Sequence, residues 1–216
     1  MPDHGRVERN EVPGPTVLPC GDRALLVEVP DAAAVAAVRT VLERSPLPGQ
    51  RELVPAARTL LVLLDRPPTE VDVAALRRLS PASAPDDRPG PLVELPVVFD
   101  GPDLAEVAGL TGRTVADLVA ELTGVELTVA FGGFVPGFGY LTGLPAELHV
   151  PRRATPRTRV PAGSVGLAGP FAGAYPRASP GGWQLVGRTD AVLFDVDRDP
   201  PALLVPGARV RFRVVG

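Results

Sequence analysis

The regular helical spacing of apolar residues stops near Val125, and this change of pattern constrains the fold more than any other feature of the sequence. After it, short apolar runs alternate with turns rich in glycine and proline. Closely spaced short strands of this kind predict a β-barrel or a β-sandwich. The predicted strands cover residues 125–131, 165–168, 183–186, 191–195 and 209–215.

Before this change, strand and helix patterns alternate along the chain. The order is strand, helix, strand, strand and helix, and one more strand follows. This order fits a small α/β sandwich of ferredoxin-like type. The predicted segments are strands in 16–29 around a turn at 20–22, a helix at 32–44 capped by Asp31, a hairpin of 51–55 and 58–64, a helix at 69–79 and a strand at 92–99.

Two domains follow from these patterns, and the fold class is α+β. Residues 1–15 form a predicted flexible leader, 16–90 the α/β domain and 91–216 the barrel domain. The boundary is placed in the Pro- and Ser-rich connection at 80–91, which has turn-forming composition. Two short helices, at 104–110 and 114–122, are expected at the start of the second domain.

Composition excludes several classes of protein and of site. Cys20 is the single cysteine, His4 and His149 are the only histidines, and there is no lysine. A cysteine-based metal cluster, a P-loop lysine and a Schiff-base lysine are therefore excluded. The net charge of −3 does not favour a nucleic-acid partner. No apolar run is long enough for a membrane span or a signal peptide, so we expect a cytoplasmic protein.

Positive charge is concentrated in residues 148–189. This segment has six arginines and no acidic residue, and 12 of the 23 glycines lie between Gly132 and Gly187. Prolines at 151, 156 and 161 predict a stiff loop, which would hold arginine side chains in place for an anionic ligand. The alternative is a solvated basic loop.

The candidate binding residues come from three stretches of this region. Ser164 is expected to form hydrogen bonds rather than to act as a nucleophile, because Ala162 replaces the first glycine of a G-x-S-x-G motif. Core packing is the alternative for the aromatic residues. We assign no catalytic residue and no metal ligand. The candidates are Phe134, Pro136, Phe138, Arg153, Arg157, Arg159, Ser164, Gly166, Ser179, Gly182, Trp183, Gln184 and Arg188.

The most specific prediction concerns the arginines. Arg153, Arg157 and Arg159 are expected to line one anion-binding pocket. Ser164, Gln184 and Arg188 are expected to complete it. Guanidinium groups match carboxylate and phosphate oxygens in bidentate geometry, and no acidic residue of the segment is available to neutralise them.

Four sequence motifs resemble those of the 5-oxoprolinase B-subunit family. This family is also known as allophanate hydrolase subunit 1 or as the sporulation-kinase inhibitor family. The motifs are GFVPGFGYLTGL (133–144), PRRATPRTRVPAGSVGLAG (151–169), YPRASPGGWQLVGRT (175–189) and PGARVRF (206–212). The resemblance extends from about Gly21 to the end of the chain. It implies a cyclophilin-like β-barrel after the N-terminal α/β domain.

The resemblance also implies an activity and partners. The chain would be one component, inactive alone, of an ATP-dependent complex with subunits A and C that opens 5-oxoproline to glutamate. ATP would carry Mg as its counter-ion, without a protein metal cluster. The alternatives are an inhibitory binding protein of a sensor histidine kinase, an allophanate-hydrolase-type subunit, and a relative that has lost activity. The last is suggested by Phe171 after GLAG and by the missing histidine near Leu122.

Overall fold

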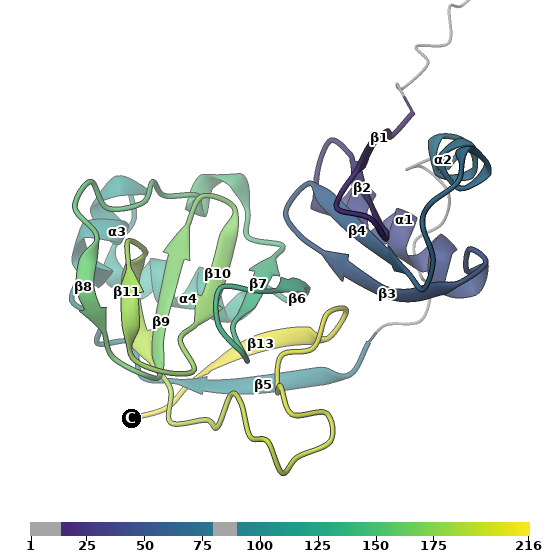
Figure 1. Ribbon diagram of the computed structural model, residues 1–216. Helices are drawn as coiled ribbons and strands as arrows, with labels where there is room; N and C mark the ends of the chain where they lie inside the picture. Colours follow the sequence, from purple (N-terminus) through teal and green to yellow (C-terminus); the bar gives the residue numbers. More distant parts are fainter. Residues whose placement is uncertain (1–13, 80–89) are drawn as a thin grey trace, which may run out of the picture. The chain divides into compact units, whose positions relative to one another are not determined.

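The computed structural model describes residues 14–79 and 90–216, and these residues form two compact units (Figure 1). Among these residues, the first unit comprises 14–54 and 58–79, and the second comprises 90–216 together with 55–57. The predicted leader and most of the predicted connection at 80–91 lie outside the described residues, so the domain boundaries stay a prediction.

The first unit is a four-stranded sheet with two helices. Its sheet order is β1-β2-β4-β3, and β2 pairs antiparallel with both β1 and β4. The expected strand at 92–99 does not belong here, because β5 (Leu92–Val97) pairs with β13 in the second unit. The fourth strand of this sheet is β1, which lies at its edge beside β2. The elements are β1 (Thr16–Pro19), β2 (Ala24–Glu28), α1 (Ala32–Arg44), β3 (Gln50–Pro55), β4 (Thr59–Leu64) and α2 (Glu70–Arg77).

Helix α1 begins where the sequence predicts it. The Asp31 carboxylate accepts a hydrogen bond from the Ala34 amide at 2.8 Å, which satisfies a donor at the start of the helix. Val35, Val38 and Leu42 recur at helical spacing and are buried in the core of this unit.

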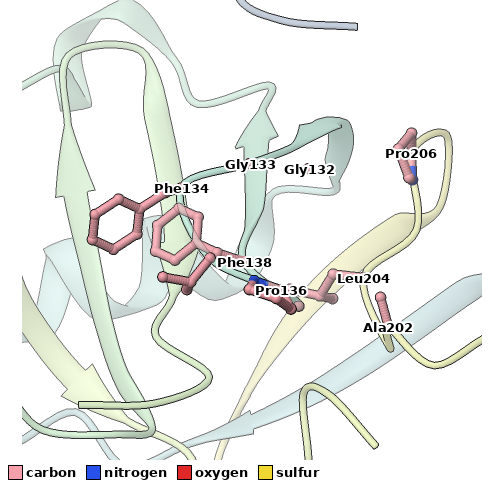
Figure 2. Close-up of a pocket in the computed structure, with 10 residues that line it drawn as sticks. Gly132, Gly133, Phe134, Pro136, Phe138, Ala202, Leu204 and Pro206 are labelled. Carbon is pink, nitrogen blue, oxygen red and sulfur yellow. The ribbon is translucent and has the colours of Figure 1, made fainter. Parts of the chain in front are cut away.

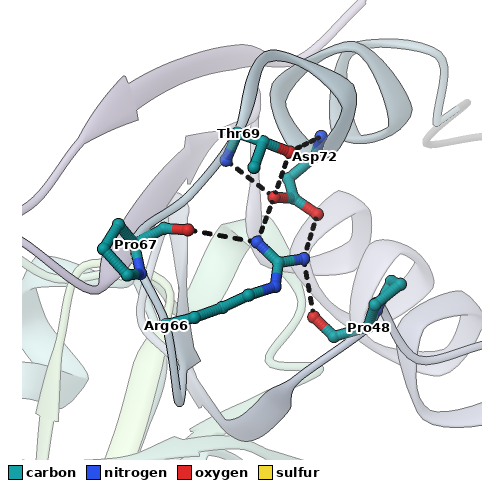
Figure 3. A network of polar contacts seen from close by, with 5 residues as sticks. All are labelled: Pro48, Arg66, Pro67, Thr69 and Asp72. Carbon is teal, nitrogen blue, oxygen red and sulfur yellow. Dashed lines mark hydrogen bonds and ion pairs between the residues drawn. The ribbon is translucent and has the colours of Figure 1, made fainter.

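The start of α2 is fixed by a network of charged and polar groups (Figure 3). Thr69 and Asp72 form a capping box. Arg66 donates two hydrogen bonds to the Asp72 carboxylate, at 2.8 and 2.9 Å, and one to the Pro48 carbonyl at 2.8 Å. The Arg66 guanidinium and the Thr69 donors hold the pKa of the buried Asp72 well below its usual range. This network joins α2 to the turn that follows α1.

The second unit is built on a seven-stranded sheet that nearly closes into a barrel (Figure 1). The order is β12-β9-β10-β7-β6-β13-β5, with β13 and β5 parallel. Val98 and Arg188 exchange two backbone hydrogen bonds of 2.9 Å, which brings the end of β5 to β12. Gly187 permits this approach, since a Cβ at this position would lie 2.5 Å from the Val98 carbonyl oxygen.

The strands of the second unit differ in part from those predicted. The run at 191–195 is not a strand and contributes only a bridge from Phe194 to Ala202. Residues 157–160, expected within a loop, form β8, which pairs with β11 in a separate two-stranded sheet. Beyond β5, the strands are β6 (Leu127–Gly132), β7 (Gly139–Thr142), β8 (Arg157–Val160), β9 (Ser164–Ala168), β10 (Phe171–Ala174), β11 (Ser179–Gly181), β12 (Gln184–Arg188) and β13 (Arg209–Val214).

Two hydrophobic clusters fill the second unit. Helices α3 (Leu104–Leu110) and α4 (Val115–Gly124) contribute to a large aliphatic core together with the barrel strands. A smaller, mostly aromatic cluster includes Phe138, Tyr175 and Trp183. Across residues 14–79 and 90–216, no helix has the length and apolarity needed to cross a membrane.

Candidate functional site

The loop between β6 and β7 contains an unusual backbone conformation. Phe134 has φ of 65°, and it is the only non-glycine residue with positive φ among those the structure describes. Such a conformation is unfavourable for a bulky residue, and strained backbone of this kind is enriched at functional sites. The Phe134 side chain is also 57% exposed. The loop therefore presents an aromatic ring to solvent in a strained conformation.

This loop forms one wall of a pocket of about 410 Å³ (Figure 2). Residues 132–138 line one side, and Ala202, Leu204 and Pro206 line the other. Three predicted binding residues, Phe134, Pro136 and Phe138, therefore come together at one cavity. No charged side chain lines it, so the pocket suits an apolar group and cannot by itself neutralise an anion.

Aromatic rings pack behind the loop. The Phe138 ring centroid lies 5.2 Å from that of Tyr175 and 5.3 Å from that of Trp183. Trp183 is 3% exposed, so the core-packing alternative describes this residue. A Cβ at Gly173 would lie 3.0 Å from the Phe138 ring and 3.1 Å from the Trp183 ring. Glycine here makes room for the rings, which explains part of the glycine enrichment of this region. Burial raises the pKa of the Tyr175 hydroxyl.

A buried carboxylate organises two of the predicted arginines. The Asp103 Oδ1 atom accepts a hydrogen bond from Arg153 Nη1 at 2.8 Å and another from Arg157 Nη2 at 2.7 Å. Its Oδ2 atom accepts from the Leu185 amide at 2.7 Å. Burial alone would raise the pKa of Asp103, but the hydrogen bonds from Arg157 and Leu185 and the charges of both arginines hold it below its usual range.

The other predicted arginines lie elsewhere. Arg188 pairs with Asp100 at 3.0 Å, because the end of β12 lies beside Val98 and directs this side chain to the surface. Arg159 is exposed on β8 and contacts no carboxylate among the described residues. The structure thus groups Arg153 and Arg157, and it does not bring Arg159 or Arg188 onto Asp103.

The neutralising carboxylate comes from outside the basic segment. The predicted anion pocket was built from residues 148–189 only, whereas Asp103 lies 50 positions before Arg153. Sequence reasoning missed Asp103, because an aspartate before a helix is explained sufficiently as a cap. In the structure its side chain makes no cap hydrogen bond with α3 and faces the arginines instead.

The remaining candidate residues lie in strand pairs or form backbone hydrogen bonds. Ser164 and Gly166 are buried on β9, with Ser164 opposite Arg188 in the strand register. Ser179 pairs with Val160 at the start of β11. The Gly182 carbonyl accepts a hydrogen bond from the Arg153 amide at 2.8 Å, which fixes the backbone of Arg153.

Gln184 lies on β12 next to Leu185, whose amide binds Asp103. It is 2% exposed, and its Nε2 atom lies 3.5 Å from the Pro151 carbonyl oxygen, a long hydrogen bond. The Gln184 Oε1 atom, Arg153 Nε and Arg157 Nη1 are buried and have no hydrogen-bond partner among the described residues. Within the described ranges, no set of three or more His, Cys, Asp or Glu side chains is arranged to hold a metal ion.

Comparison with known proteins identifies the family. The profile of the family described as carboxyltransferase domain, subdomain C and D, matches residues 15–204. An Escherichia coli O157:H7 protein, named as the B subunit of 5-oxoprolinase, is 42% identical over 205 residues, which are 89% of this chain and 92% of that protein. The chain belongs to the 5-oxoprolinase B-subunit family. A Bacillus subtilis member of this family, with the same name, is 34% identical, and the match covers 89% of each chain.

Solved structures show the fold of the 5-oxoprolinase B-subunit family in longer chains as well. TTHA0988 is 35% identical with a TM-score of 0.72, and the match covers 90% of this chain but only 40% of TTHA0988. PH0987 from Pyrococcus horikoshii is 34% identical with a TM-score of 0.57, and the match covers 97% of its length. The Kluyveromyces lactis urea carboxylase shares the fold at 22% identity, with a TM-score of 0.70.

Proposed function

We propose that this chain is the B component of an ATP-dependent 5-oxoprolinase-type complex, which opens 5-oxoproline to glutamate. The names of relatives up to 42% identical over most of the chain support this reading. The observation that carries it is the pair of arginines on Asp103, because 5-oxoproline bears a carboxylate that such a pair can bind.

The chemistry explains why anion-binding groups are needed. A lactam is a poor electrophile because its nitrogen donates electrons into the carbonyl. Transfer of the terminal phosphoryl group of ATP to the lactam oxygen makes the ring carbon open to attack by water. After one water adds to this carbon, the C–N bond breaks and leaves an acyl phosphate of glutamate. A second water hydrolyses the acyl phosphate to glutamate and inorganic phosphate. This chain would contribute guanidinium groups that orient the carboxylate and offset negative charge during these steps.

Other surface arginines are candidates for the ATP phosphates. Arg152, Arg159 and Arg177 are exposed, and none of their side chains contacts a carboxylate within the described residues. Their donors fit phosphate oxygens, and the Mg that accompanies ATP would neutralise the rest of the charge. The pocket beside Phe134 would accept an apolar part of a ligand.

We also propose that the chain works with subunits C and A. The match to TTHA0988 supports this arrangement, since more than half of that chain has no counterpart here. We further infer that the first unit is ferredoxin-like, with β1 as its edge strand, and that the second is a cyclophilin-like barrel. The sheet orders support these two descriptions.

The test is an activity assay of the reconstituted complex. The chain is co-expressed with subunits A and C, and glutamate release from 5-oxoproline is measured with and without ATP. We expect ATP-dependent release from the complex and none from the isolated chain. Turnover by the isolated chain would refute its role as one component of a complex, and a folded complex without turnover would refute the substrate.

A further inference from the structure

Two guanidinium groups share the charge of one buried carboxylate. Asp103 is 2% exposed and faces Arg153 and Arg157 through the same oxygen. The other acidic group nearby, Glu106, lies 3.9 Å from Arg153 Nη1 and is 56% exposed, so water screens its charge. The cluster thus keeps excess positive charge at a partly buried position.

Three buried polar atoms, on the two arginines that bind Asp103 and on Gln184 next to Leu185, lack hydrogen-bond partners within residues 14–79 and 90–216. Arg153 Nε and Arg157 Nη1 are donors, and Gln184 Oε1 is an acceptor. A buried polar atom without a partner is unfavourable and calls for a specific explanation. The arginine side chains are 30% and 23% exposed, so part of each one is accessible from solvent. A complementary ligand has anionic acceptors and an N–H donor.

We propose that Asp103 is a positioning residue and that this cluster binds a small carboxylate with an amide N–H. Arg153 and Arg157 receive the carboxylate, and Gln184 Oε1 accepts the N–H. Asp103 holds the two guanidinium groups side by side, so they are arranged before the ligand arrives. The inference rests on the proposed function, since 5-oxoproline has both groups, and it assigns the part of the molecule that each residue binds.

The backbone supports this arrangement. Arg153 and Arg157 follow Pro151 and Pro156, whose rings fix φ. The Arg153 amide is bound to the Gly182 carbonyl at 2.8 Å, close to Gln184 in the chain. The loop, β12 and Asp103 are therefore joined through backbone as well as side-chain hydrogen bonds.

The experiment measures affinity by calorimetry, using the complex with subunits A and C. Three ligands are compared: 5-oxoproline, 3-oxocyclopentane-1-carboxylate, which lacks the N–H, and 2-pyrrolidinone, which lacks the carboxylate. We expect the wild type to prefer 5-oxoproline over the carbocyclic analogue by about tenfold or more, because the buried acceptor would otherwise stay unpaired. Gln184→Leu should reduce this preference to below about threefold.

Asp103→Asn is expected to weaken both carboxylate ligands by about tenfold and to leave 2-pyrrolidinone nearly unchanged. Asp100→Asn, at the exposed pair with Arg188, is the matched control and should change none of the affinities beyond about twofold. A purely structural role of Asp103 would not change the dependence on the ligand's carboxylate. If Asp103→Asn does not fold, Arg153→Lys tests the dependence of affinity on the ligand's carboxylate. Gln184→Leu tests its dependence on the ligand's N–H group.

The outcomes separate this inference from the proposed function. If the complex hydrolyses 5-oxoproline while Gln184→Leu keeps the wild-type preference, the inference is refuted and the function stands. An unchanged carboxylate dependence in Asp103→Asn has the same meaning. If the wild-type complex neither binds nor hydrolyses 5-oxoproline, both are refuted.

Discussion

Replacing Arg157 by lysine tests whether the basic loop binds a ligand. Arg157 uses Nη2 to bind Asp103 at 2.7 Å and leaves Nη1 without a partner. Lysine keeps the charge but has a single ammonium group, which cannot reproduce the two directions of the guanidinium fork. The expected loss is one charge-assisted hydrogen bond, about 1.5–3 kcal/mol, or a roughly ten- to hundredfold weaker affinity for 5-oxoproline.

Arg213→Lys is the matched control. Arg213 lies on β13 in an exposed pair with Glu94 at 3.0 Å, so its replacement should change affinity by less than about threefold. Affinity is measured by calorimetry on the assembled complex, and the thermal unfolding midpoint confirms that each variant is folded. If Arg157→Lys binds as tightly as the wild type, the loop is a solvated surface and the site assignment is wrong.

Three further predictions concern stability and the strained loop. Asp72→Asn should lower the free energy of unfolding of the first unit by about 2 kcal/mol, because it removes the charge bound by Arg66. Glu43→Gln, in an exposed pair, should cost less than about 0.5 kcal/mol in the same denaturant titration. Because the pKa of Asp72 is lowered in the folded state, its stabilisation is present above the ordinary carboxyl pKa of about 4 and is lost as pH falls below it. The unfolding midpoint of Asp72→Asn should therefore depend less on pH in this range than that of the wild type, and equal slopes would contradict this. Phe134→Gly should raise stability or leave it within about 0.5 kcal/mol, since glycine tolerates positive φ. A large loss of stability would show that the exposed ring is a packing residue.

Local sequence signals predicted the secondary structure of the first unit well. The helix at 32–44 and its cap Asp31 are confirmed, because both depend on side chains within a few positions of one another. The pairing partners of the strands were harder to predict from the sequence. The strand at 92–99 continues the strand and helix order of the first unit, although the predicted boundary places it in the second domain. It pairs with β13, more than 100 positions later in the chain, and no local pattern specifies this partner.

Some features of the candidate site also follow from the sequence alone, and others only from the tertiary structure. The sequence by itself determined that arginines and glycines are concentrated in residues 148–189 and that Phe134, Pro136 and Phe138 lie in one loop. Only the tertiary structure decided which arginines act together. Asp103 lies 54 positions before Arg157 and 82 before Leu185, and it meets them because barrel closure brings the start of α3 to β12. Electrostatic pairing depends on distance in space, so an acidic residue absent from the segment could still organise it.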